Sequence, residues 1–306
     1  MSGAGKRARL RLPGTSANLG PGFDTLALAL KLHLEIEAEA AGEFTIEATG
    51  RNAEACAATK DNLLIDTYSL LLRHHGRAVV PLRVRMQNGI PLGMGCGSSA
   101  AVRLAAVSLA SHFGELQWDG ERILAEACRL EGHPDNAAAC WLGGFVASAS
   151  EGERVQAVRF APPPAWRAVV VMPERPLATT ESRAVLPAAW PRRDVVENLQ
   201  RVALMTAAMA TGRGDLLANA MRDRLHQPYR AEACPLLGRL LPLAGQDGIL
   251  GAALSGAGPA VLLLVEHDGA AGEARKRIQQ AVEDAGPVEI LVCELESEAA
   301  RVEVTG

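Results

Sequence analysis

A stretch rich in glycine and serine, PLGMGCGSSAA (residues 91–101), leads into the apolar run VRLAAVSLA. Glycines leave backbone N–H groups uncovered, and the first turn of a helix carries partial positive charge, so such a stretch suits a phosphate group. Ser99 adds a hydroxyl oxygen, a ligand type that Mg²⁺ accepts. The same residues also suit a tight turn before a helix, and neither a Walker A loop nor a GxGxxG pattern is present. Both explanations are open at this point.

Three other stretches combine glycine with polar side chains. PGTSANLGPGFD (residues 13–24) holds Asn18 and Asp24 among glycines that permit close approach of a ligand. EGHPDN (residues 131–136) gathers two carboxylates, an imidazole and an amide, and LSGAGPAV (residues 254–261) joins two predicted strands. Each also has a structural explanation: a long turn, a helix end followed by a proline-initiated helix, and a hairpin.

The elements that position these stretches follow from hydrophobic periodicity. Alternating apolar and polar residues predict strands in LALKLHLEIEAE (residues 28–39), FTIEAT and LRVRMQ. The segments DNLLIDTYSLLLRHH, SSAAVRLAAVSLASHF and WDGERILAEACRLEG predict helices, with Asp61 as the cap that starts the first and Gly132 as the cap that ends the last. The first half is therefore predicted to mix strands and helices in an α+β arrangement.

Three consecutive prolines in APPPAW (residues 161–166) predict a stiff connector and a domain boundary. The predicted domains are residues 1–163 and 164–306. In the second, the strand RAVVVMP is followed by a long helical region, the strands ILGAALSG and PAVLLLVE, a helix and the strand VEILVCELE. That order, β-α-β-β-α-β, predicts a split βαβ sandwich.

Composition excludes several classes of function. The 31 Lys and Arg residues stand against 35 Asp and Glu, a net charge of −4, which argues against a nucleic-acid partner. No window approaches the length of an apolar membrane span and no signal peptide is recognisable, so we expect no membrane and a soluble protein of the cytoplasm. The six cysteines form no CxxC pair and predict neither a disulfide framework nor a zinc site.

Together and in this order, PGTSANLGPGFDTLALAL, PLGMGCGSSAA, EGHPDNAAA and LSGAGPAV resemble the successive motifs of the GHMP family of small-molecule kinases. SANLGPGFD and EGHPDN resemble its homoserine kinase branch in particular. The resemblance implies a two-domain GHMP kinase fold: an N-terminal, ATP-binding domain like the second domain of ribosomal protein S5, and a ferredoxin-like C-terminal domain. It implies that the γ-phosphoryl group of ATP moves to the side-chain hydroxyl of L-homoserine, on the route to threonine. A second copy of the chain is a candidate partner.

The resemblance also implies which residues hold the nucleotide. The glycine loop would wrap the triphosphate, with Ser99 and Glu131 beside Mg²⁺. Asn62 would contact adenine, although a helix cap explains it equally well. The implied nucleotide-binding residues are Asn62, Pro91, Leu92, Gly93, Met94, Gly95, Cys96, Gly97, Ser98, Ser99, Ala100 and Ala101.

For the amino acid, Arg183 and Arg230 match positions that the family uses for the carboxylate, because a guanidinium forms a bidentate pair with it. Asp24 suits the ammonium group. Without the motif context, either arginine could instead be a surface charge. The residues that would surround the reacting end are Asn18, His133, Asn136 and, near the transferred phosphoryl group, Thr179. The implied catalytic residues are Ser99, Asn136 and Thr179.

No side chain is predicted to remove the hydroxyl proton. Several GHMP kinases have an aspartate where this sequence resembles homoserine kinases in having Asn136, and an amide is not a useful proton acceptor near pH 7. The proton would go to the phosphate itself, and the rate would come from positioning and electrostatics. Asp135 is the rival base.

Two other functions are open. A GHMP kinase for another small alcohol would keep the phosphate loop but should not need two arginines beside Asp24. A non-catalytic protein could use the fold to bind a ligand, but it should not need both Ser99 and Glu131. Cys96 stands where the family's loop commonly has leucine, and its alkylation should block ATP binding unless the thiol is buried.

Overall fold

The strands predicted in the first half form a seven-stranded sheet in the computed structural model, which describes residues 5–177 and 179–306, without the side chains of residues 179–181. The sheet order is β11-β1-β2-β4-β3, with β5 paired to the first part of β2 and β6 paired to β5. Its strands are β1 (Arg7–Asn18), β2 (Gly22–Ala40), β3 (Thr45–Gly50), β4 (Leu82–Asn88), β5 (Phe145–Glu151), β6 (Arg154–Phe160) and β11 (Arg301–Thr305). The helices of this half are α1 (Ala53–Ala57), α2 (Leu63–His74), α3 (Ser98–Phe113), α4 (Gly120–Glu131) and α5 (Asp135–Leu142).

The structural explanation of residues 13–24 as a long turn is wrong, because the turn there is tight. β1 continues to Asn18, and only residues 19–21 separate it from β2. Pairing extends this far because Ala17 is fully buried, and its backbone groups need hydrogen-bond partners. The turn leaves Asn18 and Asp24 with positive φ, 66° and 56°, close to the second half of the chain.

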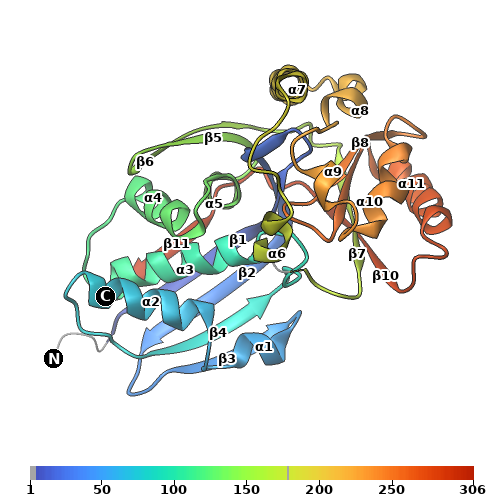
Figure 1. Ribbon diagram of the computed structural model, residues 1–306. Coiled ribbons are helices and arrows are strands. Elements are labelled where there is room, and N and C mark those ends of the chain that lie inside the picture. The colour runs from blue at the N-terminus through green and yellow to red at the C-terminus, as the bar shows by residue number, and fades with distance from the viewer. Residues whose placement is uncertain (1–4, 178) are drawn as a thin grey trace.

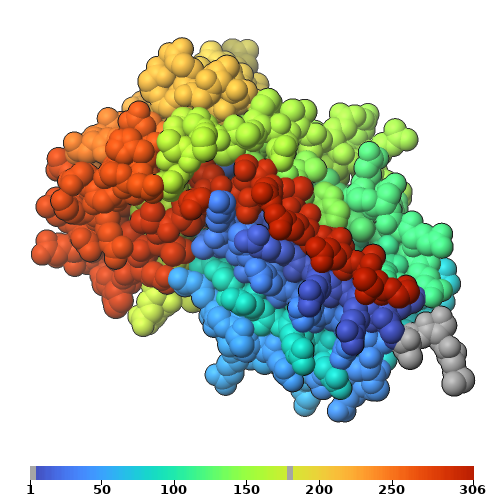
Figure 2. All heavy atoms as spheres, turned by 180° about the vertical axis from the view of Figure 1, so that it is seen from behind, coloured from blue at the N-terminus to red at the C-terminus, as the bar shows by residue number. Residues whose placement is uncertain are grey.

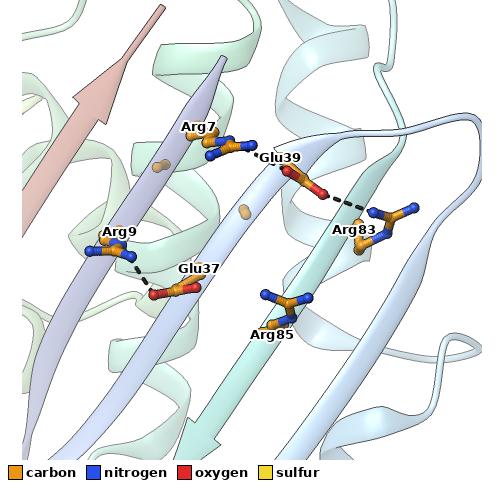
Figure 3. Close-up of a pocket in the computed structure, with 8 residues that line it drawn as sticks. Arg7, Arg9, Glu37, Glu39, Arg83 and Arg85 are labelled. Carbon is orange, nitrogen blue, oxygen red and sulfur yellow. Dashed lines mark hydrogen bonds and ion pairs between the residues drawn. The ribbon is translucent and has the colours of Figure 1, made fainter. Parts of the chain in front are cut away.

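The first sheet has one covered and one open face, as the alternation predicts. Helices α2, α3, α4 and α5 cover one face (Figure 1). The view from behind shows the opposite face, where the blue atoms of β1 and β2 and the red atoms of β11 lie at the surface (Figure 2). Charged side chains form rows across this face (Figure 3): Glu39 lies 3.5 Å from Arg7 and 2.9 Å from Arg83. Exposed pairs of this kind contribute roughly 0–1 kcal/mol each. They explain the polar positions in the alternation along these strands, and they indicate no site.

The second half forms an antiparallel four-stranded sheet in the order β10-β7-β9-β8, with a hydrophobic core of its own. Its strands are β7 (Arg167–Pro173), β8 (Ile249–Leu254), β9 (Val261–Val265) and β10 (Val288–Glu294). Its helices are α6 (Thr179–Ala184), α7 (Arg192–Thr211), η1 (Gly214–Leu216), α8 (Leu217–Ala220), α9 (Gln227–Arg230), α10 (Pro235–Leu240), η2 (Leu241–Leu243) and α11 (Asp268–Ala281). The predicted order β-α-β-β-α-β is confirmed. Among the described helices, none has the length and hydropathy that crossing a membrane requires.

The last strand, β11, was not predicted. It follows β10 in sequence but pairs with β1, with Arg301 opposite Arg11, so it lies in the first sheet (Figures 1 and 2). The predicted boundary falls between β6 and β7. The division into residues 1–163 and 164–306 stays a prediction, and β11 packs with the sheet of the first half however the boundary is drawn.

The helix ends lie near their predicted positions. Asn62, and not the predicted Asp61, caps α2, because its Oδ1 accepts from the backbone N–H of Leu64 at 3.0 Å. Gly132 ends α4 in the left-handed conformation, with φ 84°, which confirms that cap. Gly97 precedes α3 and provides no side-chain cap, so the first N–H groups of α3 are left for another acceptor.

One hydroxyl group connects the glycine loop to both halves of the molecule. Ser255 lies in the loop between β8 and β9, and its Oγ is 2.8 Å from the carbonyl oxygen of Gly95 and 2.8 Å from Oγ of Ser16. A carbonyl oxygen only accepts, so Ser255 uses its one hydroxyl hydrogen on Gly95, and the hydroxyl of Ser16 donates to Ser255 Oγ. Beside it, the N–H of Gly256 donates to the carbonyl oxygen of Ala17 at 3.0 Å. Three segments far apart in sequence therefore meet here.

Replacing Gly95 with alanine should disrupt this junction. The added Cβ would lie 2.1 Å from the carbonyl oxygen of Ser255, and the backbone φ is +77°, so a collision and left-handed strain act together. We expect Gly95→Ala to lower the free energy of unfolding by about 3 kcal/mol or more, measured by urea denaturation.

The matched control is Gly76→Ala. Gly76 also has a positive φ, +65°, but nothing lies within 4 Å of an added Cβ. This variant should lose only about 1 kcal/mol, the cost of left-handed strain alone. Equal losses in the two variants would contradict the expected collision.

Candidate active site

Most of the predicted site residues line one cleft of about 430 Å³, where the glycine loop, the β1–β2 turn, the end of α4 and helices α6 and α9 meet. The predicted residues that line it are Asn18, Asp24, Gly93, Gly95, Cys96, Gly97, Ser98, Ser99, Ala100, Glu131, His133, Asn136, Arg183 and Arg230. The four motifs therefore converge on one place, although they are spread over most of the chain.

Some predicted residues lie outside this cleft. Pro91, Leu92 and Met94 line a neighbouring hollow of about 350 Å³. Ala101 is buried inside α3. Thr179 begins α6, but its side chain lies outside the described part of the chain, so its role stays a prediction.

Asn62 does not line the cleft either. Besides accepting from Leu64, its amide donates to the carbonyl oxygens of Ala58 at 2.7 Å and Cys56 at 3.3 Å. Both ends of the amide are therefore used within the segment that leads into α2. The structural explanation of Asn62 as a helix cap is confirmed, and a contact with adenine stays a prediction.

The glycine loop owes its shape to contacts with β1. Gly97 has φ +70°, and a Cβ added there would lie 1.9 Å from Oγ1 of Thr15. The N–H of Thr15 donates to the carbonyl oxygen of Cys96 at 2.9 Å. This close approach directs the uncapped N-terminus of α3 into the cleft, where its N–H groups can hold an anion.

The thiol of Cys96 is 1% exposed, and burial raises its pKa to about 12. A buried, protonated thiol is a poor nucleophile. The structure therefore supports the expectation that the thiol of Cys96 is buried and inert, and not the expectation that its alkylation blocks ATP binding.

Two oxygens at the edge of the cleft suit a divalent cation. Ser99 Oγ lies 2.6 Å from Glu131 Oε1. Magnesium holds oxygen ligands at about 2.0–2.1 Å in octahedral geometry, which places neighbouring ligands about 2.9 Å apart. Ser99 Oγ and Glu131 Oε1 would therefore need to move apart only slightly to bind the ion together. The donor set, a hydroxyl and a carboxylate, fits the cation.

A buried carboxylate, that of Asp135, also lines the cleft. Asp135 is 1% exposed, and its Oδ1 lies 2.5 Å from His133 Nδ1 and accepts from the backbone N–H of Asn136 at 2.7 Å. Burial by itself lowers the pKa of His133, but the hydrogen bond and the charge of Asp135 outweigh it and raise that pKa. Asn136 is oriented in turn by Thr15, whose hydroxyl donates to Asn136 Oδ1 at 2.7 Å.

On the opposite side, Asp24 and Arg183 form a bidentate ion pair, with atom separations of 2.6 and 3.1 Å. Arg230 is 1% exposed and pairs with no carboxylate among the described residues. The guanidinium carbons of Arg183 and Arg230 each lie 5.5 Å from the centre of the Phe23 ring. This ring attracts both cations and holds them on one side of the cleft.

Arg230 is oriented by His226. Nδ1 of His226 accepts from NH1 of Arg230 at 3.0 Å, and its Nε2–H donates to the carbonyl oxygen of Gly20 at 2.7 Å. This pattern requires the neutral imidazole with its proton on Nε2. Burial is the largest cause that lowers the pKa of His226, and the charge of Arg230 lowers it further.

Sequence reasoning missed Phe23, Arg103 and His226. Arg103 lines the cleft four residues after Ser99, and His226 precedes Arg230 by four residues. Residues four apart lie on one side of a helical turn, so this spacing was the signal that could have found both. Nothing in the sequence marks Phe23 except its place beside Asp24.

The sequence and structure match known kinases. A family model described as "GHMP kinases N terminal domain" matches residues 62–144, and one described as "GHMP kinases C terminal" matches residues 205–284. A homoserine kinase of Solibacter usitatus is 44% identical over 268 residues, which cover 87% of this chain and 88% of that relative. The chain belongs to the homoserine kinases of the GHMP kinase family. A homoserine kinase of Moorella thermoacetica is 39% identical, with 91% of this chain and 96% of the relative covered.

Solved structures agree with this GHMP kinase assignment. The crystal structure of homoserine kinase from Cytophaga hutchinsonii superposes with a TM-score of 0.81 at 22% identity, over 97% of each chain. Mevalonate kinase of L. major, in complex with R-mevalonate, superposes with a TM-score of 0.70 at 17% identity, over 95% of this chain and 97% of that one. At such identities the likeness shows the fold alone, and the predicted two-domain GHMP kinase fold is confirmed.

The neutral state of His226 makes stability depend on pH. The pKa of His226 is lowered in the folded protein, so just below the ordinary histidine pKa of about 6.5 the unfolded chain binds more protons than the folded protein does. The contribution of neutral His226 to the free energy of unfolding is therefore lost as the pH falls through that range. His226→Gln removes the titrating group. We expect the wild type to be more stable than this variant at pH 7, and the difference in free energy of unfolding to narrow between about pH 7 and pH 5.

His74→Gln provides the control, because His74 is exposed on α2. Its difference from the wild type should stay small over the same range. Urea denaturation at several pH values measures both differences. A difference for His226→Gln that does not change with pH would show that His226 need not be neutral.

Proposed function

We propose that this protein transfers the γ-phosphoryl group of ATP to the side-chain hydroxyl of L-homoserine, which yields O-phospho-L-homoserine on the route to threonine. Its place among the homoserine kinases supports this reaction. The observation that carries it is one cleft with an anion-binding helix N-terminus on one side and an Asp24–Arg183–Arg230 cluster on the other. An amino acid with an alcohol side chain fits between them.

The charged cluster selects the ends of the amino acid. Carboxylate oxygens of Asp24 and Asp135 lie within 4.8 Å of each other, beside His133, and these two carboxylates make this part of the cleft suited to an ammonium group. Arg230 is buried and has no carboxylate partner among the described residues, so a substrate carboxylate would supply the missing negative charge. Arg183 would give up part of its ion pair with Asp24 and bind the substrate carboxylate as well.

The N-terminus of α3 and the glycine loop would hold the triphosphate. Ser99 and Glu131 would hold Mg²⁺, which when bound neutralises phosphate charge and orients the γ-phosphoryl group. The loop would bring backbone N–H groups to the phosphates, and its glycines carry no side chains that would cover those groups. A Cβ at Gly95 or Gly97 would collide with Ser255 or Thr15, so packing against these two residues holds the loop in place.

We further propose that no side chain acts as the base. The homoserine oxygen attacks the γ-phosphorus, the bond from that phosphorus to the bridging oxygen of ADP breaks, and the hydroxyl proton passes to an oxygen of the transferred phosphoryl group. Asn136 is a neutral amide, and Asp135 uses Oδ1 on His133 and on the backbone of Asn136. Its position supports a role in orienting His133 and Asn136.

The substrate assignment predicts a selective change in affinity. Arg183→Met should raise the KM for L-homoserine about 10- to 100-fold, because charge-assisted hydrogen bonds contribute roughly 1.5–3 kcal/mol, while the KM for ATP stays near its wild-type value.

Phosphorus NMR of the wild type with ATP, Mg²⁺ and a panel of alcohols identifies the product. Another phosphoester would favour a kinase for a different alcohol, and no product at all would favour a ligand-binding protein.

The base-free route predicts a modest effect of Asp135→Asn. The amide keeps an acceptor for His133, so we expect kcat to fall no more than about 100-fold, with a small change in the KM for L-homoserine. His133→Gln, which removes the partner of the same hydrogen bond, should have an effect of similar size. A loss of many orders of magnitude in kcat for a folded Asp135→Asn protein alone would identify Asp135 as the base.

A further inference from the structure

Arg103, on the second turn of α3, contacts both oxygens of the expected metal site. Its Nε lies 2.6 Å from Glu131 Oε1 and 3.4 Å from Ser99 Oγ. Since Ser99 and Arg103 are four residues apart on one helix, the helix itself places their side chains together. One guanidinium therefore lies against the two atoms that would hold a divalent cation.

Burial distinguishes this ion pair from the exposed pairs on the open sheet face. The side chain of Glu131 is 9% exposed and that of Arg103 is 25% exposed. A carboxylate so shielded from water needs a positive partner. Among the described residues, no other lysine or arginine pairs with Glu131, so Arg103 neutralises this carboxylate in the absence of ligands.

We propose that Arg103 competes with the divalent cation for Glu131 and Ser99, and that its guanidinium must leave the carboxylate when the metal binds. The inference rests on the proposed function, because it takes these two residues as the metal-binding pair. A guanidinium and a divalent cation cannot both lie against one carboxylate oxygen without strong repulsion between them. Free metal therefore binds weakly, and it enters with the nucleotide.

The released guanidinium has a new partner within reach. Arg103 lines the same cleft as the N-terminus of α3, where the phosphates would lie. A guanidinium forms charge-assisted hydrogen bonds with phosphate oxygens, so the nucleotide stabilises the displaced arginine. Arg103 is thus a positioning residue that couples metal entry to nucleotide binding.

Replacing Arg103 should shift metal and nucleotide affinity in opposite directions. Arg103→Met keeps most of the aliphatic stem and removes the charge. Without nucleotide, it should bind Mn²⁺ about tenfold more tightly or better than the wild type, measured by the loss of the free Mn²⁺ signal in electron paramagnetic resonance. In EDTA, it should bind ADP several-fold more weakly, measured by calorimetry.

Arg129→Met is the matched control. Arg129 NH2 lies 2.6 Å from Glu126 Oε1 on α4, so this variant also loses an arginine–glutamate ion pair, but neither residue lines the cleft. It should leave both affinities at wild-type values. Adding Glu131→Gln to Arg103→Met should abolish the gain in Mn²⁺ affinity, which assigns the gain to this carboxylate. If Arg103→Met does not fold, Arg103→Gln replaces it.

Equal Mn²⁺ affinity in the wild type and the folded Arg103 variant would overturn the proposal, and so would the same gain in Arg129→Met. The proposed function is decided separately by the phosphorus NMR of the wild type. If no phosphohomoserine forms, that function fails, while the Mn²⁺ titration without nucleotide still decides whether Arg103 competes for the metal. If product forms and the titration shows no gain, only the role of Arg103 fails.

Discussion

The hydroxyl of Ser255 holds the glycine loop against both halves of the protein, and the geometry of the cleft depends on that contact. It donates to the carbonyl oxygen of Gly95 and lies 2.8 Å from the hydroxyl of Ser16. Because Gly95 and Gly97 have no side chains, the loop can lie close enough for these bonds to form. The N-terminus of α3 is thereby fixed relative to Asp24 on the β1–β2 turn.

Charges within the cleft are largely paired with one another in the absence of ligands. Asp24 pairs with Arg183, and Glu131 pairs with Arg103. Buried or half-buried charges are costly without partners, so this pairing keeps the ligand-free cleft stable. Each expected ligand would replace one member of a pair: the substrate ammonium and carboxylate at Asp24–Arg183, and the metal at Glu131–Arg103. Arg230 stands apart, because a neutral histidine and a backbone carbonyl, and not a carboxylate, orient it.

Predictions from the sequence succeeded for elements with a clear local pattern, and they failed where the partner is distant or where the local pattern allows more than one interpretation. The apolar periodicity of α3 and the alternation of β2 predicted those elements well. The strand β11 escaped notice because its partner, β1, lies at the other end of the chain. The cap of α2 was misplaced by one residue, since Asp61 and Asn62 suit the position equally well by type. Arg103 was overlooked because it lies within the mostly apolar stretch that predicted α3.

The sequence by itself determined the α+β class, the membership in a kinase family and most of the residues that line the cleft, because motifs and periodicities are read over short stretches of chain. Tertiary structure alone decided which charges face one another. Asp24 and Arg183 are 159 residues apart, yet their side chains form a bidentate pair. Electrostatic energy depends on distance in space, which local patterns do not contain, so the pairings, the tautomer of His226 and the position of Arg103 followed only from the fold.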